Sequence, residues 1–531
     1  MSCIPPLFDT PSPKGNLIWV LTIVISFLGG CSTTPAVTDR PYSSAYRDPD
    51  ETTLGRLARP HLEKHPDLSG FLILDAGSKA LEQRLALLDS AERSFDAQYY
   101  IWNSDLSGRY MAGRVLHAAR RGVKVRLLID DWTLGGRDKA LLAMDDHRNI
   151  EVRVFNPTRP RSVVGKSLAF LGDFDRLNRR MHNKSFTVDG SITIVGGRNI
   201  GDEYFDLHPT LNFRDRDLLV AGPIVERVSN SFDAFWNSQW ARPISAVAKD
   251  TRPADEFRKA QMRLLEESVE SPAFSRPADN TGDQDARVSA ILDDAVWAQA
   301  QLVFDEPDDP DRMMDTDRRM PVAVALGQLV RDAREEVLIE SAYLVLGDEQ
   351  LVSLDDVKSR GVRVSALTNS LASNDVVPNH AAYARRRPSM LAHGLEIREL
   401  RPDPASCPQI IQSGAGCGGD ALLGLHAKSM VFDRKILYVG SSNVNLRSIY
   451  LNFEIALVVF SSELADRVAT AIERDMRLEN SWHVKQDADG IIEWVGSKNG
   501  QPERWTTEPN AGLWKRMSSG LWSLFPLEKY L

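Results

Sequence analysis

The sequence predicts an α/β fold in which two similar domains follow one another. A strand, a helix and a second strand succeed one another within 35 residues early in the chain, and the same series returns in the second half. A four-residue pattern also occurs twice at one fixed offset. With 531 residues, 43% of them hydrophobic and 26% charged, the chain is long enough for two or three domains. We therefore expect a duplicated α/β architecture rather than a barrel or a helical bundle.

The first residues predict an export signal. Residues 17–28 are a mostly apolar run, shorter than the roughly 20 residues that cross a bilayer, so we expect a signal-peptide core within residues 1–30. The run ends in Leu-Gly-Gly-Cys31, which resembles the bacterial lipobox, in which the cysteine becomes the lipidated first residue. An uncleaved, short anchor helix is the alternative. Both interpretations hold the protein to a membrane, outside the cytoplasm.

Polar composition predicts a tether after this signal, and two cysteines remain beyond it. Residues 31–60 are rich in Thr, Pro, Ser and Asp and lack apolar periodicity, which is typical of a flexible segment. Cleavage removes Cys3 and acylation uses Cys31, so only Cys407 and Cys417 are left. An oxidising compartment favours a disulfide between them, and two free surface thiols are the alternative.

The two domains are expected over residues 61–245 and 321–482. The strand, helix and strand that open them are 95–102, 110–121 and 123–129 in the first domain, and 337–343, 352–360 and 362–368 in the second. Gly122 and Gly361 stand between helix and second strand in the two copies, as helix C-caps do. The repeat therefore includes the glycine that ends each helix.

Two further segments lie outside the repeat. Residues 246–320 contain a helical stretch and a charge-dense, proline-broken loop, and are expected to be a linker. Residues 483–531 form a C-terminal extension that predicts one short amphipathic helix. Its apolar positions are Leu513, Trp514, Met517, Leu521, Leu524 and Phe525. The helix can lie on a membrane surface or pack against its own domain, and packing is favoured because Gly520 and Pro526 keep it short.

The repeated pattern is a His and a Lys two residues apart, an Asp five residues later and an Asn ten residues after the Asp. The two copies are His182, Lys184, Asp189 and Asn199, and His426, Lys428, Asp433 and Asn443, 244 residues further on. Each Lys begins an apolar run that ends at a turn residue before a second apolar run, which predicts a strand hairpin. In a strand, residues two apart point to one face, so each His and Lys project together.

Such side chains suit substitution at phosphorus. An in-line displacement needs an attacking group on one side of phosphorus and a proton donor on the other, and two copies supply one His for each. The lysines and the Asn amides would stabilise the non-bridging oxygens, which is work that a metal ion does elsewhere. The chemistry therefore requires neither a metal ion nor another cofactor. Two imidazoles that share one phosphate are expected to titrate as a coupled pair.

The duplicated motifs, each followed by Gly-x-x-Asn, resemble those of the phospholipase D superfamily. The stretches RLNRRMHNK and GGRNIGDEYF are similar to the bacterial cardiolipin synthases, particularly to the lipoprotein-like form, and the likeness extends over roughly residues 70–531. The resemblance implies two α/β/α sandwich domains related by a pseudo-two-fold axis, with the active site at their interface. Members of the superfamily include phospholipases, nucleases and phosphatidyltransferases.

The resemblance also assigns roles. It implies that Asp217 and Glu454, which open the strand after each motif, bond the far ring nitrogen of the catalytic histidines; an exposed charge at a strand start is the alternative. It favours His182 as the nucleophile and His426 as the acid and base, although the sequence is symmetric on this point. The motif Asp residues, Asp189 and Asp433, complete the catalytic set, but their place at a turn indicates that they hold the hairpin or bond across the halves.

We expect a membrane-attached phosphatidyltransferase that makes cardiolipin from phosphatidylglycerol and a second phospholipid, such as phosphatidylethanolamine. A phospholipase D that uses water, a periplasmic nuclease and an inert lipid-binding lipoprotein are the alternatives. The net charge of −9 disfavours a nucleic-acid partner. The expected location is the bacterial cell envelope, facing the periplasm. Ser32 resembles an outer-membrane sorting residue, whereas a lipid synthase is expected at the inner membrane, so the choice of membrane stays open.

Overall fold

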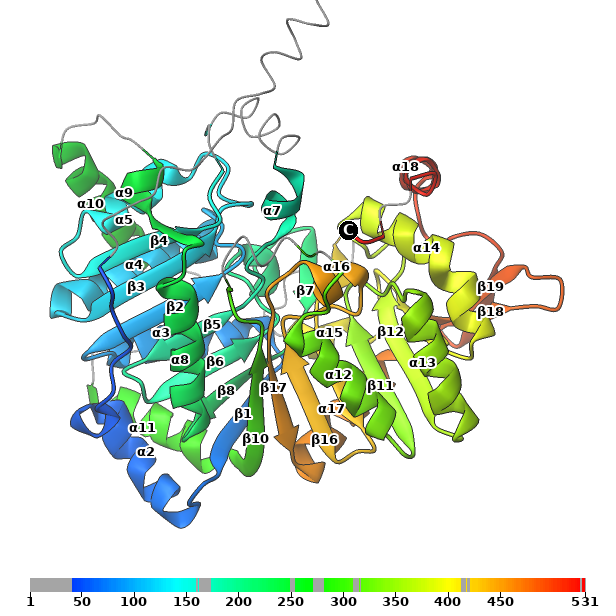
Figure 1. Cartoon of the computed structure of the whole chain (residues 1–531), viewed down its shortest axis with the longest axis horizontal. Helices are drawn as coiled ribbons and strands as arrows, with labels where there is room; N and C mark the ends of the chain where they lie inside the picture. The colour runs from blue at the N-terminus through cyan, green and yellow to red at the C-terminus, as the bar shows by residue number, and fades with distance from the viewer. Residues whose placement is uncertain are drawn as a thin grey trace, which may run out of the picture.

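The computed structural model describes residues 41–158, 161, 173–248, 254–270, 281–308, 315, 317–411, 417, 421–525 and 528–530. The predicted signal peptide and Cys31 lie outside these residues. Within them, the chain forms two α/β halves that stand side by side (Figure 1). The predicted fold class is confirmed. In the described ranges, every helix is too short or too polar to span a bilayer.

The first half is built on one mixed sheet. In spatial order its strands are β1 (Ser69–Leu74), β8 (Asp217–Ala221), β6 (Ile192–Gly196), β5 (Ser185–Val188), β2 (Ser94–Tyr99), β3 (Lys124–Asp130), β4 (Ile150–Phe155) and β9 (Ala241–Pro243). The central strands β2, β3 and β4 are parallel and the other pairs are antiparallel. Helices α3 (Gly77–Ser90) and α4 (Leu106–Arg121) pack on one face of the sheet, and α8 (Ile224–Trp236) packs on the other.

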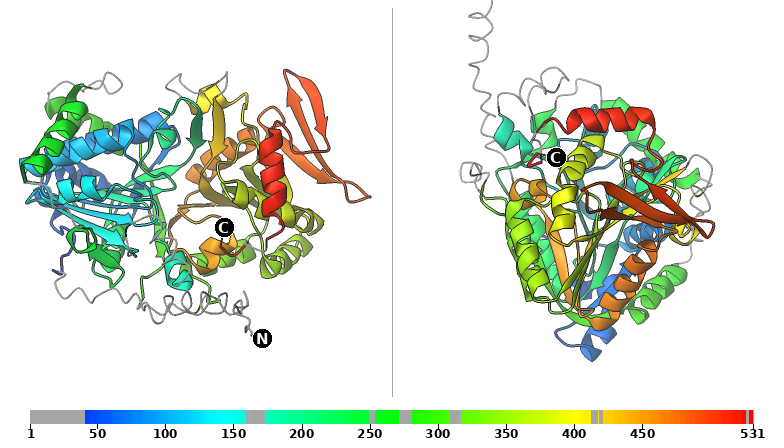
Figure 2. Two further views of the ribbon diagram at one scale, coloured as in Figure 1. Left: turned by 90° about the horizontal axis from the view of Figure 1, so that it is seen from above. Right: turned by 90° about the vertical axis from the view of Figure 1, so that its right-hand side faces the viewer.

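The second half repeats this order strand for strand. The strands are β10 (Val296–Phe304), β17 (Ile455–Phe460), β16 (Ile436–Gly440), β15 (Lys428–Phe432), β11 (Glu336–Ser341), β12 (Arg363–Asn369), β13 (Glu396–Leu400) and β18 (Ser481–Gln486). Helices α12 (Pro321–Asp332), α13 (Asp348–Ser359) and α14 (Val377–Ala392) cover one face, and α17 (Ser462–Asp475) covers the other. Figure 2 shows the two halves from above and from one end.

Strand β10 joins the two sheets into one. Its residues 296–298 pair with β1, and residues 299–304 pair with β17. The expected linker over 246–320 is therefore wrong in part, because the second sheet begins inside it. The sheet also continues past residue 482, through β18, β19 (Ile492–Lys498) and β20 (Gln501–Trp505). Helices α10 (Ala254–Glu270) and α11 (Thr281–Asp293), which precede β10, contact helices of the first half.

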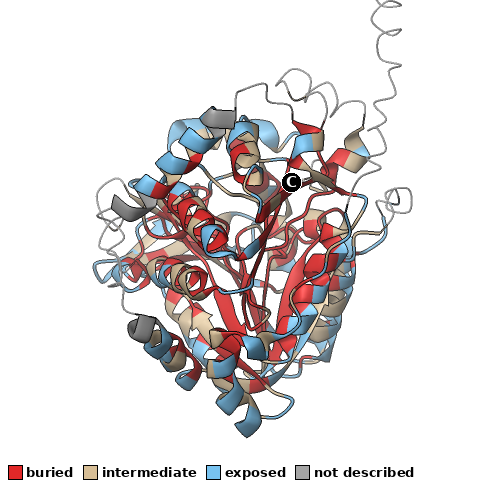
Figure 3. Cartoon of the chain, turned by 90° about the vertical axis from the view of Figure 1, so that its left-hand side faces the viewer, coloured by how far each residue is buried: buried red, intermediate tan, exposed pale blue. Residues whose placement is uncertain are grey.

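The expected tether over 31–60 is also wrong from residue 41 onward. The backbone N–H of Ala45 donates to both oxygens of Asp233, at 3.0 and 2.9 Å. Thr52 caps helix α2 (Thr53–Lys64), and Leu54 on that helix is fully buried. A few buried contacts and side-chain hydrogen bonds hold this part of the chain in place. Its polar composition gives no sign of them, so the sequence predicted a flexible segment. Figure 3 shows the buried sheet beneath a partly exposed helical layer.

A small parallel sheet ties the halves together at their boundary. Strands β7 (Leu211–Arg214) and β14 (Leu422–Leu425) pair in register, Arg214 opposite Leu425. A parallel bridge between Met181 and Phe453 makes a second link of the same kind. In each link, one segment ends immediately before a motif histidine, His182 or His426. The other segment comes just before the last strand of the opposite motif region, β17 or β8. Near β14, Cys407 and Cys417 are joined by a disulfide with a Cα–Cα distance of 5.8 Å.

Candidate functional site

Each repeated motif lies on an antiparallel hairpin. The first is β5–β6 and the second is β15–β16, and the His and Lys precede or begin the first strand of each. Asp189 and Gly190 have φ values of 52° and 60°, and Asp433 and Arg434 have 51° and 50°. These residues form a tight turn closed by a backbone hydrogen bond at 3.0 Å, from Ser191 to Val188 and from Lys435 to Phe432, within a three-residue connection between the paired strand ends. The hairpins predicted from the sequence are therefore present in both halves.

The motif Asp residues hold these hairpins to their own sheets. The Asp189 carboxylate accepts the backbone N–H groups of Glu92, Arg93 and Ser94 at 2.7–2.9 Å. Asp433 accepts the equivalent N–H groups at 334–336 in the second half. Of the roles considered for these residues, holding the hairpin fits the contacts, and a bond across the halves does not. Both carboxylates lie at the turn, at the opposite end of the strand from the histidine.

The two histidines lie at the boundary between the halves, and each is fixed by the other half. The backbone N–H of His182 donates to the carbonyl of Phe453 at 2.8 Å, and that of His426 donates to the carbonyl of Arg214 at 2.8 Å. Ring Nδ1 of His182 lies 2.8 Å from Glu454 Oε2, and ring Nδ1 of His426 lies 2.6 Å from Asp215 Oδ2. An Nδ1–H that donates to a carboxylate leaves the Nε2 lone pair for chemistry.

Glu454 therefore has its predicted contact, but Asp217 does not. The Asp217 carboxylate binds the buried Arg84 and Arg198, at 2.9 and 3.2 Å. Strand pairing explains the difference, because Gly196 pairs with Asp217 in the first sheet and Gly440 pairs with Ala456 in the second. The counterpart of Glu454 is thus two residues before Asp217. Aligning the apolar runs Leu-Leu-Val and Leu-Val-Val that follow would have identified Asp215.

The surroundings of the two carboxylates differ in one useful way. Ser441 and Ser448 donate their hydroxyls to Glu454, the latter at 2.7 Å. Gly197 occupies the position of Ser441 in the first half, and a Cβ there would lie 2.2 Å from Asp215 Oδ1. The glycine thus leaves room for the Asp215 carboxylate. Small residues after each motif indicate a close approach there, but the sequence alone does not show that Gly197, Ser441 and Ser448 contact the two carboxylates.

The two lysines complete a buried, charged centre. Lys184 Nζ donates to its own His182 carbonyl at 2.6 Å, and Lys428 makes the same contact with His426. Burial lowers the pKa of Lys184 well below its ordinary value and lowers the pKa of Lys428 to about 8. Each lysine lowers the pKa of the histidine in the other half as well as its own. The two His–Lys pairs therefore act on one another as parts of a single site.

Burial and the lysines keep both imidazoles neutral at pH 7. Burial is the main cause, and it lowers the pKa of His182 to about 4 and that of His426 to about 3, against the opposing effect of the carboxylates. In return, the imidazole and lysine hold the pKa of Glu454 below its ordinary value even though burial raises it. A neutral imidazole is a nucleophile. An anionic phosphodiester beside the rings would favour the imidazolium form of the second one.

The motif Asn residues make different contacts in the two halves. Asn199 Oδ1 accepts the N–H of Ile101 at 3.1 Å, and its Nδ2 donates to the hydroxyl of Tyr204 at 3.0 Å. The Tyr204 ring lies edge-on to His426, with centroids 5.0 Å apart. Asn443 Oδ1 is buried and has no hydrogen-bond partner among the described residues. Phosphate binding by either amide stays a prediction.

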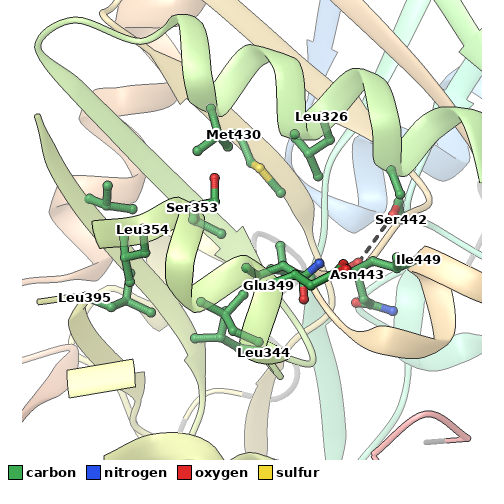
Figure 4. A pocket seen from close by; sticks show the side chains of 18 of the residues that line it. Leu326, Leu344, Glu349, Ser353, Leu354, Leu395, Met430, Ser442, Asn443 and Ile449 are labelled. Carbon is green, nitrogen blue, oxygen red and sulfur yellow. Dashed lines mark hydrogen bonds between the residues drawn. The ribbon is translucent and has the colours of Figure 1, made fainter. Parts of the chain in front are cut away.

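An apolar cavity extends from Ser442 and Asn443 into the second half (Figure 4). It lies between helices α12 and α13 and the sheet, and Arg319 and Glu349 also line it. Its apolar lining includes Leu326, Val330, Ile339, Leu344, Leu346, Leu354, Val364, Leu395, Met430 and Ile449. Met430 is two residues after Lys428, so it lies on the same face of β15 as that lysine.

Among the described residues, no group of three or more His, Cys, Asp or Glu side chains is placed to hold a metal ion. Lys184 and Lys428, buried beside the two histidines, can supply positive charge to a phosphate without a metal ion. The arrangement supplies two imidazoles backed by carboxylates and two ammonium groups at one boundary. Together they can carry a substitution at phosphorus with a covalent imidazole intermediate.

Comparison with known proteins agrees with this chemistry. A family model described as "Cardiolipin synthase, PLD-like domain" matches residues 85–236 and 326–476. Cardiolipin synthase C of Escherichia coli (strain K12) is 34% identical over 472 residues, which is 88% of this chain and 98% of that protein. A cardiolipin synthase of Oceanobacillus iheyensis is 23% identical over 409 residues, covering 77% of this chain and 69% of that one. The crystal structure of phosphatidylserine synthase from Haemophilus influenzae shares the fold, with a TM-score of 0.55 and 12% identity over 90% of this chain and all (100%) of that one.

We expect Asp215→Asn and Glu454→Gln each to lower kcat for a phosphodiester substrate by about 10²- to 10⁴-fold, with KM little changed, because an amide cannot stabilise the imidazolium. Steady-state kinetics on the folded variants will measure this. Asp217→Asn is the matched control: it should lower the melting temperature, because it frees two buried arginines, and leave kcat of the folded protein within a few-fold. A control that loses kcat as severely as Asp215→Asn would contradict the assignment.

The histidines should also make stability depend on pH. Their folded pKa values lie below the ordinary value of 6.5, so below that pH the unfolded chain binds protons first and the folded state loses stability. Between pH 6.5 and 5 the loss should approach about 1.4 kcal/mol per pH unit for each imidazole. Denaturant unfolding of the wild type and of a His182→Asn/His426→Asn double variant across this range will test it. Equal slopes for the two proteins would show that the rings are not buried neutral.

Proposed function

The chain belongs to the family of cardiolipin synthases with phospholipase D-like domains, and on that basis we propose that it is a phosphatidyltransferase that makes cardiolipin. One substrate is phosphatidylglycerol, and the second is another phospholipid, either phosphatidylglycerol or phosphatidylethanolamine. The observation that carries the proposal is the exchange of carboxylates across the boundary, Glu454 to His182 and Asp215 to His426. Two imidazoles oriented in this way can serve the two sides of an in-line displacement.

In the first step, His182 Nε2 attacks the phosphorus of the donor lipid. A P–N bond forms as the P–O bond to the headgroup alcohol breaks, and imidazolium His426 gives its proton to the departing alkoxide. In the second step, His426 takes a proton from a free glycerol hydroxyl of phosphatidylglycerol, which is therefore the acceptor. That oxygen attacks phosphorus, the P–N bond breaks, and cardiolipin leaves with His182 neutral again. Phosphatidylethanolamine has no such hydroxyl and can serve only as the donor in the first step, with ethanolamine as the leaving alcohol. The order of the two histidines follows the tendency of the family.

The other charged groups of the site support both displacements. Lys184 and Lys428, whose ammonium groups bond the carbonyls of His182 and His426, would stabilise the non-bridging oxygens as negative charge develops on them. Glu454 and Asp215 stabilise each imidazolium as it forms and fix its tautomer. The Asn199 and Asn443 amides are proposed as further donors to the phosphate. No step requires a metal ion.

The apolar cavity beside Asn443 supports a lipid substrate. Its lining is aliphatic apart from the Ser442–Asn443 end and a few polar residues, including Arg319 and Glu349. An acyl chain can occupy such a space, whereas a nucleotide or sugar would bury polar groups there without partners. The net charge of −9 likewise disfavours a nucleic-acid substrate.

We also propose that the protein is a lipoprotein of the cell envelope, acylated at Cys31 and facing the periplasm. The Leu-Gly-Gly-Cys sequence after the apolar run supports acylation. The disulfide between Cys407 and Cys417 supports an oxidising compartment, because cytosolic thiols are kept reduced.

Incubation of the purified protein with labelled phosphatidylglycerol should yield cardiolipin and glycerol with EDTA present. If added phosphatidylethanolamine is the donor, its phosphatidyl group should appear in cardiolipin with release of ethanolamine, and thin-layer chromatography with mass spectrometry will identify each species. The His182→Ala/His426→Ala double variant is the blank. Phosphatidic acid as the sole product would replace the proposal with a hydrolase, and abolition of turnover by EDTA would contradict the metal-free mechanism.

A covalent phosphatidyl adduct should accumulate on His182 in a His426→Ala variant supplied with a phosphatidyl ester of an acidic phenol. That leaving group departs without a proton from residue 426, whereas transfer to the second lipid still needs the missing base. Rapid acid-free quenching and peptide mass spectrometry will locate the adduct, which P–N chemistry makes labile to acid. The converse variant, His182→Ala, should carry none. An adduct on His426 in that variant would reverse the two roles.

A further inference from the structure

The helix near the C terminus turns its apolar side chains to solvent. In α18 (Leu513–Trp522), Leu513 is 75% exposed, Trp514 80%, Met517 59% and Leu521 61%. Leu524 and Phe525, just after the helix, are 73% and 52% exposed. The expectation that the apolar side packs against the protein is therefore wrong. Large apolar side chains gathered on one exposed helix mark an interaction site.

The polar side of α18 attaches it to the second half. Lys515 Nζ donates to the backbone carbonyls of Leu371, Ala372 and Asn374 at 3.1–3.4 Å. Arg516 donates to the Glu508 carbonyl at 2.7 Å. Figures 1 and 2 show α18 resting on α14 at the outside of the molecule. The helix is thus fixed in place with its apolar face outward.

The attachment point belongs to the rim of the catalytic site. The loop 371–374 leads to Asp375, which accepts a hydrogen bond from the hydroxyl of Tyr343 at 3.0 Å. The positive charges of Lys428, in the catalytic site, and Lys515, on α18, both interact electrostatically with the Asp375 carboxylate. After the helix, the Tyr530 carbonyl accepts a hydrogen bond from Arg447 at 2.8 Å. The Arg447 guanidinium in turn interacts electrostatically with the carboxylate of Glu454, the partner of His182. Both ends of the C-terminal segment are therefore connected to groups around the two histidines.

The first half exposes an aromatic side chain at the corresponding place. Trp132 is 52% exposed and follows β3, as the loop that holds α18 follows β12. Its ring lies 6.0 Å from the Arg180 guanidinium, two residues before His182. Since β3 and β12 occupy equivalent positions in the repeat, apolar exposure occurs on the same side of both halves.

We propose that α18, with Leu524 and Phe525, is a membrane-docking surface that inserts into the headgroup region of a phospholipid bilayer and sets the catalytic site at the lipid. This inference rests on the proposed function. A helix of ten residues is about 15 Å long, too short to span but suited to lie flat, with its apolar face about 5–10 Å deep. Tryptophan favours that interface, and α18 carries Trp514 and Trp522. A second protein copy on this face would cover the rim that a lipid must pass.

The test is a Trp514→Ser/Leu521→Ser variant of the full chain. Its kcat/KM should fall by about tenfold or more for phosphatidylglycerol in vesicles of phosphatidylethanolamine and phosphatidylglycerol. It should match the wild type for a short-chain phosphatidylglycerol dissolved below its critical micelle concentration. Val352→Ser, on α13 and 67% exposed, is the matched control and should leave both values unchanged.

Further outcomes separate the docking surface from the proposed function. Equal loss on both substrates, or loss on neither, would overturn the docking proposal. Loss of a dimer in light scattering, with vesicle turnover unchanged, would instead assign the face to a second copy and overturn it too. If the wild type turns over neither substrate, the proposed function fails. In that case, hydrogen exchange of residues 513–525 tests the docking proposal by itself. Slower exchange in the presence of vesicles would support docking, and unchanged exchange would overturn the docking proposal.

Discussion

The structure depends on one exchange: each catalytic imidazole receives its carboxylate from the other half of the chain. His182 is bonded to Glu454, 272 residues later, and His426 is bonded to Asp215, 211 residues earlier. Hydrogen bonds with a charged partner contribute about 1.5–3 kcal/mol each, and loss of one buried partner costs more. Neither half has a complete site by itself, so the duplication is a requirement of the chemistry.

The exchange sets strict demands on the backbone around it. The Met181–Phe453 bridge and the β7–β14 pair fix the register in which each carboxylate approaches its ring. Small residues also leave room for the carboxylates, as Gly197 does for that of Asp215. The turn at the other end of each hairpin is held by Asp189 or Asp433, so these acids act on the histidines only by positioning the strand. Within one repeated motif, some side chains serve the reaction and others hold the hairpin.

Local pattern was enough to predict the duplicated α/β architecture, both hairpins and the His–Lys pairs. It was not enough where a distant contact decides. Asp215 lies just before β8 and Asp217 begins it, and the pairing of β8 with β6 determines which of them reaches a histidine; in the sequence, only an alignment of the apolar runs after the two motifs indicates this. Helical periodicity likewise gave the two sides of α18, but the carbonyls that bind Lys515 determine which side meets the protein. Strand β10, in which apolar and polar residues alternate, was not predicted, because the charged sequence after it indicated a linker.

The β1–β10 pair has a consequence for synthesis of the chain. Residues 69–71 of β1 take their partners from residues 296–298, so the first sheet keeps a bare edge until more than half of the polypeptide has been made. An unpaired edge is a template for wrong association between chains. The early half is therefore most open to aggregation while it is still nascent, and a chaperone that shields this strand during elongation or export would act at the moment of greatest need.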